Sequence, residues 1–168
     1  MSSDKTWVDM VREFHARHTA PVVQMPNAAS PMLRDSLLTT SEILADAAEE
    51  FLAMSRADAP LTPAERTVAL RCSLMCEELG ETLDALGDEA STLDGLCDLV
   101  YVAIGTALQL DLPITEAFVA VHAANMKKQT CKQSSDQRLH DKGPGWQSPD
   151  IDAVIAEHRR RCNANVHG

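Results

Sequence analysis

The chain is poor in aromatic residues, has no excess of positive charge and contains no Cys-x-x-Cys pair. Phe, Trp and Tyr make up 4% of its 168 residues, which suits the packing of helices better than a β-sandwich or a barrel. The formal net charge of −10 argues against binding to a nucleic-acid polymer or to a membrane surface. A phosphorylated substrate is not excluded, because a bound metal can reverse the sign of a local site. The length favours one domain with a real core.

The cysteines indicate a reducing compartment. Their number, five, is odd, and three of them fall at core-like positions of expected helices: Cys72, Cys76 and Cys97. Small buried thiols are therefore favoured over disulfides or a zinc site. No apolar run is long enough to span a bilayer, and residues 1–5 contain no apolar signal region. We expect a cytoplasmic protein with no membrane partner.

Helical patterns dominate the chain, and no segment shows the period of a strand. The strongest start signal is a capping box at residues 62–65, with Thr62 as N-cap, Pro63 at the first helical position and Glu65 at the third. A second capping box, at residues 39–42, predicts a helix that begins there. The expected helices cover residues 7–18, 39–54, 62–86, 92–110, 114–128 and 148–161.

Two of these helices are expected to form the centre of a bundle. The segments 65–86 and 93–110 should pack antiparallel to each other. The second segment is apolar on more faces than one partner helix can cover. We therefore expect a second subunit to complete the bundle.

Five carboxylates on two neighbouring segments form the most informative pattern. Glu77, Glu78 and Glu81 are close together on one expected helix, and Asp94 and Asp98 are one turn apart on the next, where Asp94 could instead be a capping residue. If the two helical faces meet, several acidic oxygens come together and repel one another, which requires a strong cation. Hard divalent ions such as Mg²⁺ or Mn²⁺ prefer oxygen ligands of this kind.

Asp98 favours such a metal site over the alternative, which is an acidic helix face in contact with solvent. It lies in a segment, residues 96–104, that is apolar almost all round and is therefore expected to be buried. A buried, unpaired carboxylate costs on the order of several kcal/mol and must find a partner. A metal is one candidate partner, and a tertiary contact with Arg34, Lys127 or Lys128 is another.

Positive groups are missing from the centre of the chain. No Lys or Arg occurs between Arg71 and Lys127. The acidic cluster cannot hold a triphosphate by itself, so the first positive groups available for phosphates are Lys127 and Lys128, followed by Lys142 beside a Gly-Pro-Gly loop. The alternative interpretation of Lys127 and Lys128 is a favourable interaction with the dipole of the helix that they end.

Five segments follow one another in an order that resembles a known family. They are residues 11–15 with Pro21 and Val22, the E-E-x-x-E motif at 77–81, a second acidic motif at 94–102, a helix end at 121–128, and the loop at 142–146 with 149–151. Together they are similar to the all-α nucleoside triphosphate pyrophosphohydrolases, which include the MazG-like enzymes, phosphoribosyl-ATP pyrophosphohydrolase and the dimeric dUTPases. The small phosphoribosyl-ATP-pyrophosphohydrolase-like branch of phages and bacteria is the most similar, and the resemblance covers most of the chain.

This resemblance implies an enzyme on a MazG-like helical bundle that is completed by oligomerisation. It would cleave a nucleoside triphosphate between the α and β phosphates with Mg²⁺ or Mn²⁺ as cofactor, and would form a homodimer or homotetramer. The implied metal ligands are Glu77, Glu78, Glu81, Asp94 and Asp98. The implied catalytic residues are Glu77, Glu78 and Lys128. The implied substrate-binding residues are His15, Tyr101, Asn125, Lys128, Lys142 and Trp146.

Three of the substrate-binding candidates have to be weighed against other roles. His15 is more often a surface or core histidine, and Tyr101 is more often a core residue than a base-stacking one. Trp146, in the Gly-Pro-Gly loop, is the better aromatic candidate to cover a base. A second acidic pair, Glu49 and Glu50, lacks a third Glu at the right offset and is interpreted as a solvated face.

The expected organisation is one MazG-like domain, residues 1–168, in which 129–168 supply a C-terminal substrate loop and a short helix. Two features depart from the family. Many relatives have E-x-x-D as the second motif, where this chain has Gly95 and where Asp94 supplies the missing carboxylate. The segment 34–60 is also longer than in compact relatives.

The substrate remains open among several nucleotides. We expect dGTP, GTP or another purine dNTP, and the alternatives are dUTP or dCTP and phosphoribosyl-ATP. A helical interaction module without activity is a further alternative. A di-iron protein is disfavoured because the chain contains no Glu-x-x-His. The expected location is the cytoplasm, or the host cytoplasm if the chain is phage-encoded.

Overall fold

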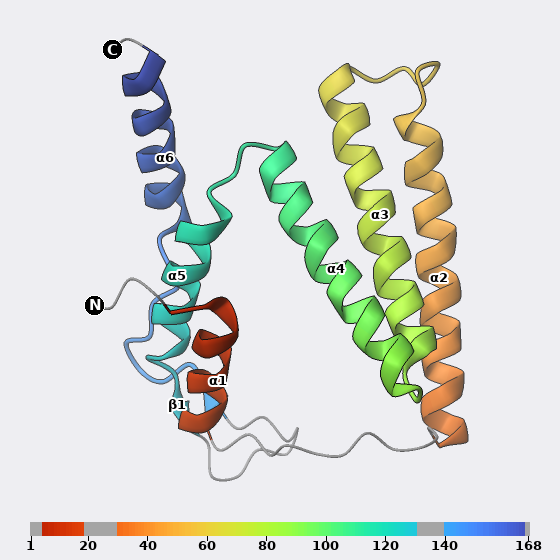
Figure 1. Ribbon diagram of the computed structural model, residues 1–168, viewed down its shortest axis with the longest axis horizontal. Helices are drawn as coiled ribbons and strands as arrows, with labels where there is room; N and C mark the ends of the chain where they lie inside the picture. The colour runs from red at the N-terminus through yellow and green to blue at the C-terminus, as the bar shows by residue number, and fades with distance from the viewer. Residues whose placement is uncertain (1–4, 19–29, 131–139, 167–168) are drawn as a thin grey trace. The chain divides into compact units, whose positions relative to one another are not determined.

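The computed structural model describes residues 5–18, 30–130 and 140–166, and helices make up most of them (Figure 1). The all-α class predicted from the sequence is confirmed. Two strands of two residues each pair antiparallel, with Gln129 opposite Asp141, and they are too short to show alternation in the sequence. In chain order the elements are α1 (Trp7–Arg17), α2 (Pro31–Ser55), α3 (Pro63–Ala85), α4 (Glu89–Gln109), α5 (Ile114–Asn125), β1 (Gln129–Thr130), β2 (His140–Asp141) and α6 (Ile151–Val166).

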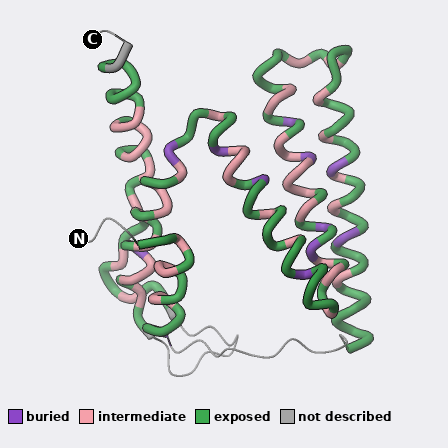
Figure 2. Tube along the Cα trace, in the orientation of Figure 1, coloured by how far each residue is buried: buried purple, intermediate pink, exposed green. Residues whose placement is uncertain are grey.

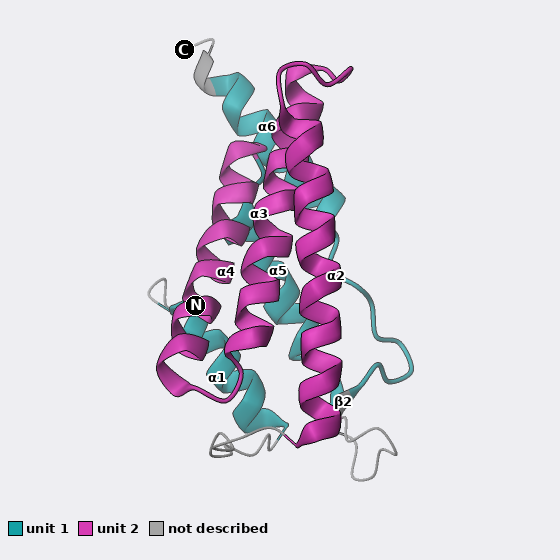
Figure 3. Ribbon diagram, turned by 90° about the vertical axis from the view of Figure 1, so that its right-hand side faces the viewer, with its two compact units in different colours: residues 1–23, 112–168 teal, residues 24–111 magenta. Residues whose placement is uncertain are grey.

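The chain divides into two compact units, which are coloured separately in Figure 3. Unit 1 comprises Met1–Val23 and Leu112–Gly168 and contains α1, α5, α6 and the two strands. Unit 2 comprises Gln24–Asp111 and contains α2, α3 and α4. Each unit has its own internal contacts. The single domain expected over residues 1–168 stays a prediction.

The start of α3 is as predicted. Thr62 Oγ1 accepts a hydrogen bond from Glu65 N at 3.3 Å, and the Glu65 carboxylate accepts one from Thr62 N at 2.8 Å. These reciprocal bonds satisfy amide groups that a helix start otherwise leaves without partners. The capping box therefore fixes where the helix that carries the E-E-x-x-E motif begins.

The predicted start of the preceding helix is wrong. α2 begins at Pro31, before the predicted capping box, and Ser30 caps it by accepting a hydrogen bond from Leu33 N at 3.3 Å. Proline at the first helical position suits this earlier start. The hydroxyl of Thr40, which belongs to the predicted box, instead donates to Ser36 O at 2.8 Å inside the helix. The helix therefore passes through the predicted cap without interruption.

Other helix ends also differ from the predictions. α4 begins at Glu89, because Asp88 accepts a hydrogen bond from Ser91 N at 2.8 Å and so caps the helix. Asp94 is consequently an interior residue of α4, and its alternative interpretation as a capping residue is wrong. α5 is shorter than predicted, and α6 is longer.

In unit 2, α2 and α3 pack closely because small side chains lie between them. Ser73 Oγ donates to Ala48 O at 2.8 Å, and both residues are buried. At Gly80, a Cβ atom would lie 3.5 Å from Leu44 Cβ, which is ordinary van der Waals contact. The two helices accordingly run side by side in both views (Figures 1 and 3).

α4 turns back along α3, so the predicted antiparallel pair is present, and it is joined at two levels (Figure 1). Near the turn, Gly95 packs on Thr82, where a Cβ atom would lie 2.8 Å from Thr82 Oγ1. Farther along, the guanidinium of Arg71 on α3 donates to Val102 O at 2.7 Å and to Thr106 Oγ1 at 3.0 Å on α4. The small residue Gly95 suits the close contact near the turn, and the long side chain of Arg71 suits the larger separation farther along, because the two helices diverge away from their turn.

Little of α4 is buried in the single chain (Figure 2). Its buried residues are Thr92, Val102 and Ala107. By length and composition alone α4 could cross a membrane, and 11% of that window is buried. By this criterion the prediction that no apolar run is long enough to span a bilayer is wrong. The second subunit expected to complete the bundle stays a prediction.

Replacing Arg71 with Met should lower the free energy of unfolding by roughly 1–3 kcal/mol, because hydrogen bonds from a charged donor are lost while the side-chain stem is kept. The measurement is the denaturant midpoint at an unchanged slope. Arg56→Met is the matched control, since Arg56 is exposed and forms no ion pair among the described residues. Equal midpoints for the two variants would show that Arg71 does not hold α4 to α3.

Candidate functional site

The predicted metal ligands lie on the paired helices of unit 2. Glu77, Glu78 and Glu81 belong to α3, and Asp94 and Asp98 belong to α4. Glu78 is half-buried, whereas the other four are exposed. The turn between α3 and α4 therefore brings the two acidic motifs, which are separate in the sequence, onto adjacent helices.

The electrostatics of Glu78 shows that these carboxylates act on one another. The pKa of Glu78 is raised above its usual value, first by burial and then by the negative charges of Asp98, Glu81, Glu77 and Asp94, in that order. Each effect disfavours the charged form of Glu78. The largest of the charge effects comes from Asp98 on the neighbouring helix, so the two motifs lie within electrostatic reach of each other.

Asp98 itself is exposed, so the prediction that it is buried is wrong. Leu96, Val100 and Tyr101, its apolar neighbours on α4, are themselves largely exposed and do not cover the carboxylate. Burial of Asp98 therefore does not support a metal site, whereas the negative charges that act on Glu78 do.

The donor chemistry of this set fits a hard divalent cation. Among the described residues, no three His, Cys, Asp or Glu side chains are close enough together to hold a metal ion. Carboxylates without a counter-ion repel one another and favour separation. Oxygen donors of this kind suit Mg²⁺ or Mn²⁺, and such an ion would offset the charge repulsion that, after the larger effect of burial, raises the pKa of Glu78.

A cavity of about 330 Å³ between α2 and α3 adds Glu49 to the candidate site, although the sequence pattern favoured a solvated role for this residue. Glu77 and Glu81 line this cavity from α3, and Glu49 lines it from α2. Glu49 is exposed, as its interpretation as a solvated residue requires, yet it shares a cavity with two predicted metal ligands. The signal that could have found it is its helical spacing from Ala45 and Leu52, which line the same cavity.

In unit 1, three of the predicted substrate-binding residues gather at the carboxyl end of α5. Asn125 is the last residue of that helix. Trp146 Nε1 donates a hydrogen bond to the carbonyl oxygen of the adjacent Ala124 at 2.9 Å. Lys142 Nζ lies 4.6 Å from the centroid of the Trp146 ring. The loop after β2 therefore brings its lysine and its tryptophan to the end of α5.

The remaining predicted substrate-binding residues are divided between the units. Lys128 Nζ lies 5.9 Å from the centroid of the Phe14 ring, and the centroid of the His15 ring is 6.2 Å from that of the Phe14 ring. Lys128 and His15 thus both neighbour Phe14 in unit 1. Tyr101 is on α4 in unit 2, where it is 80% exposed. Its interpretation as a core residue is therefore wrong for the single chain.

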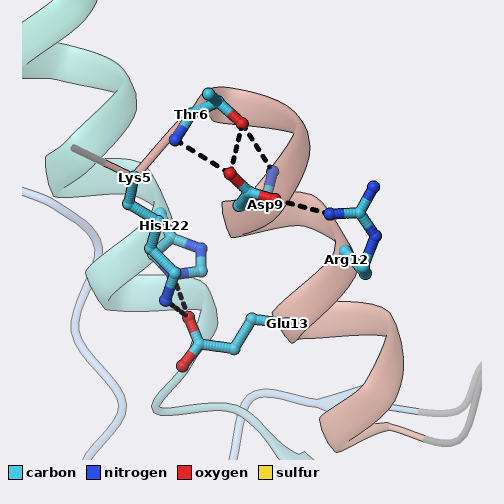
Figure 4. A network of polar contacts seen from close by, with 6 residues as sticks. All are labelled: Lys5, Thr6, Asp9, Arg12, Glu13 and His122. Atoms are coloured by element: carbon cyan, nitrogen blue, oxygen red, sulfur yellow. Dashed lines mark hydrogen bonds and ion pairs between the residues drawn. The ribbon is translucent and has the colours of Figure 1, made fainter.

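A polar network that the sequence analysis missed joins α1 to α5 (Figure 4). His122 Nε2 lies 3.1 Å from Glu13 Oε2, and Lys5 also forms an ion pair with Glu13. Hydrogen bonds from Lys5 and then from His122 lower the pKa of Glu13. Both Glu13 and His122 fall in segments that carried the family resemblance, 11–15 and 121–128, but neither had been given a role. The network helps to fix α5, whose end carries Asn125.

Comparison with known families agrees with the resemblance in the sequence. Residues 45–125 match the family model of phosphoribosyl-ATP pyrophosphohydrolase, a member of the MazG-like all-α NTP pyrophosphohydrolase superfamily. The chain matches no curated protein and no solved structure. The matched segment includes all five predicted metal ligands and Asn125, whereas His15, Lys128, Lys142 and Trp146 lie outside it.

Glu78→Gln should raise the Tm of the metal-free protein at pH 7. Because the pKa of Glu78 is raised in the folded state, the folded state binds this proton more tightly than the unfolded state does. Stability is therefore lost as pH rises from the ordinary Glu pKa through the raised one. The gain in Tm should therefore shrink as pH falls through the raised pKa and should be absent below the ordinary Glu pKa.

The control for this experiment is Glu50→Gln, which removes one charge from an exposed position on α2. Thermal melts of both variants and of the unmodified chain, recorded across the acidic and neutral range, provide the comparison. If both variants gain equally at every pH, the effect belongs to the net charge of the chain and not to the acidic cluster.

Proposed function

Because residues 45–125 belong to the all-α NTP pyrophosphohydrolase superfamily, we propose that the chain is a metal-dependent nucleoside triphosphate pyrophosphohydrolase. The reaction would cleave the anhydride between the α and β phosphates and release a nucleoside monophosphate and pyrophosphate. The observation that supports this proposal is the raised pKa of Glu78 amid four further carboxylates, all within the matched segment. Such a cluster suits a divalent cation and the metal-assisted hydrolysis that the cation supports.

The proposed roles of the acidic residues follow from their electrostatics. Glu77, Glu78, Glu81, Asp94 and Asp98 would hold Mg²⁺ or Mn²⁺, which supplies Lewis acidity toward phosphate oxygens and a water molecule. Glu78 is the first choice to accept the proton of the attacking water, because burial and its neighbours raise its pKa. Glu77 is the alternative proton acceptor.

The basic residues of unit 1 have a complementary proposed role. Lys128 and Lys142 would neutralise the charge of the phosphates, and for this reason Lys128 is also a proposed catalytic residue. Asn125 would form a hydrogen bond with a phosphate or with the sugar. His15, Tyr101 and Trp146 complete the proposed substrate-binding set. The net charge of −10 supports a free nucleotide as the substrate over a nucleic-acid polymer. We propose a cytoplasmic location for the same reaction.

We propose two substrates, in order of preference. A purine triphosphate such as dGTP or GTP is the first, following the resemblance to the small phage and bacterial branch. Phosphoribosyl-ATP is the second, because the matching family model is that of phosphoribosyl-ATP pyrophosphohydrolase. Both contain the same anhydride next to a nucleoside phosphate, so the proposed chemistry does not depend on the choice.

Turnover of a panel of NTPs, dNTPs and phosphoribosyl-ATP with Mg²⁺ or Mn²⁺ should yield the monophosphate and pyrophosphate, as resolved by chromatography. Glu81→Gln and Asp98→Asn should each reduce turnover by at least about tenfold, on the order of the loss that follows disturbance of a metal's ligand shell. They should also reduce the rise in Tm that Mn²⁺ produces in the unmodified chain. Glu50→Gln, on an exposed part of α2, should retain both properties.

The outcomes of this assay separate the candidate functions. A nucleoside diphosphate as the main product would remove the pyrophosphohydrolase proposal. Full Mg²⁺-dependent turnover by Glu81→Gln or Asp98→Asn would show that the metal site is assigned to the wrong residues. An unmodified chain with no turnover and no stabilisation by metal would favour a helical interaction module.

We also propose that a second copy of the chain covers the apolar face of α4. Leu93, Leu96, Val100 and Leu108 recur at helical spacing along this helix and are largely exposed. An apolar stripe of this length on a helix is typical of an interface between subunits. A homodimer or homotetramer would bury it.

Light scattering at micromolar concentration should therefore give the mass of a dimer or a tetramer. Val100→Asp, which places a charge within the apolar stripe, should shift the mass toward that of one chain. Val68→Asp is the control, because Val68 is an exposed apolar residue on α3, outside that stripe. A stable monomer of the unmodified chain would contradict the proposal.

A further inference from the structure

The loop that follows β2 has a defined turn at its centre. Trp146 N donates to Gly143 O at 3.0 Å, with Pro144 at the second position of the turn and Gly145 at the third. Gly145 has a φ of +81°, which is the left-handed conformation that the third position of a type II turn requires. Proline at the second position has its φ preset for this turn. The local sequence therefore fixes the direction in which Trp146 leaves the turn.

The indole of Trp146 is anchored to α5. Its Nε1 donates to Ala124 O at 2.9 Å, and Ala124 is buried. This carbonyl belongs to the last turn of the helix, where carbonyl groups lack an ordinary intrahelical partner. Lys127 N also donates to it, at 3.1 Å. The hydrogen bond thus fixes the ring of Trp146 beside Asn125, the final residue of α5.

The anchored ring in turn supports a positive charge. Lys142 Nζ lies 4.6 Å from the centroid of the Trp146 ring, within the range of a cation–π interaction. Lys142 is exposed, and in the part of the chain that the structure describes it forms no ion pair with a carboxylate. Its ammonium group is therefore held in place without being neutralised, which leaves it available to an anion.

We propose that Trp146 is a positioning residue for Lys142: the indole, hydrogen-bonded to Ala124 O, holds the ammonium at the carboxyl end of α5 as a binding group for the polyphosphate of the substrate. This inference rests on the proposed function for the identity of the anion. It gives Trp146 a role other than covering a base, because a face of its ring carries Lys142. It also accounts for the Gly-Pro-Gly turn, which sets the position of the ring.

The kinetic test is a double-mutant cycle in the full chain. Trp146→Leu and Lys142→Met should each raise KM for the nucleotide about tenfold with a smaller change in kcat, and the double variant should be no worse than either single one. Trp146→Phe, which keeps the aromatic face and loses the hydrogen-bond donor, should give an intermediate KM. Lys142→Arg should restore most of the affinity, because the positive charge and its contact with the ring are kept.

Arg159→Met is the control for the loss of one positive charge, since Arg159 is exposed on α6 and, among the described residues, forms no ion pair and lies over no aromatic ring. It should leave KM within about twofold of the unmodified value. Thermal melts identify any variant that fails to fold. Additive effects of Trp146→Leu and Lys142→Met, or unchanged KM in either, would overturn the positioning role.

A binding measurement that needs no turnover separates this inference from the proposed function. In a Trp7→Phe background the single remaining tryptophan is Trp146. Its fluorescence should change when Mg²⁺ and inorganic tripolyphosphate are added, and this change should be lost in the Trp7→Phe, Lys142→Met double variant. That result without any nucleotide turnover would leave the inference standing and remove the proposed function. Nucleotide turnover together with an identical fluorescence response in the two proteins would leave the proposed function standing and overturn the inference.

Discussion

Mutual repulsion among carboxylates at the junction of α3 and α4 is the constraint on which the candidate site depends. The contact of Gly95 with Thr82 brings the helices together near their turn, and Arg71 joins them farther along. Arg71 donates to a backbone carbonyl and a hydroxyl of α4, and it forms no ion pair among the described residues. The helix pair is therefore held together by groups that leave the acidic charge unbalanced. Burial raises the pKa of Glu78 first, and the neighbouring negative charges raise it further.

Features encoded within one helix turn could be predicted from the sequence. The start of α3 depends on contacts between residues three apart, and the spacing of Glu77, Glu78 and Glu81 depends on helix geometry alone. Contacts between helices could not be predicted in the same way. Glu49 shares a cavity with Glu77 because α2 packs on α3. The helical spacing of Glu49 from Ala45 and Leu52 indicates a common face of α2 but does not specify which helix that face contacts.

The two wrong predictions about burial and helix ends have separate physical causes. Asp98 was expected to be buried because apolar residues surround it on α4, but an apolar helix face is buried only where something covers it, and in the single chain this face is exposed. The start of α2 was misplaced because two capping signals competed. Ser30 with Pro31 begins the helix, and the hydroxyl of Thr40 then finds a backbone partner within it.

The candidate residues of the two units differ in the sign of their charge, and this difference bears on the class of ligand. Unit 2 carries the carboxylates around Glu78, and no lysine or arginine among its described residues pairs with them. Unit 1 carries Lys128 and Lys142, which lie over aromatic rings and not beside carboxylates. Among the described residues no ion pair with a side chain of opposite charge is formed by either set, so each set by itself suits a ligand of opposite sign. A complex of a divalent metal with a polyphosphate contains both signs, so the charge of each unit, taken by itself, is consistent with the proposed function.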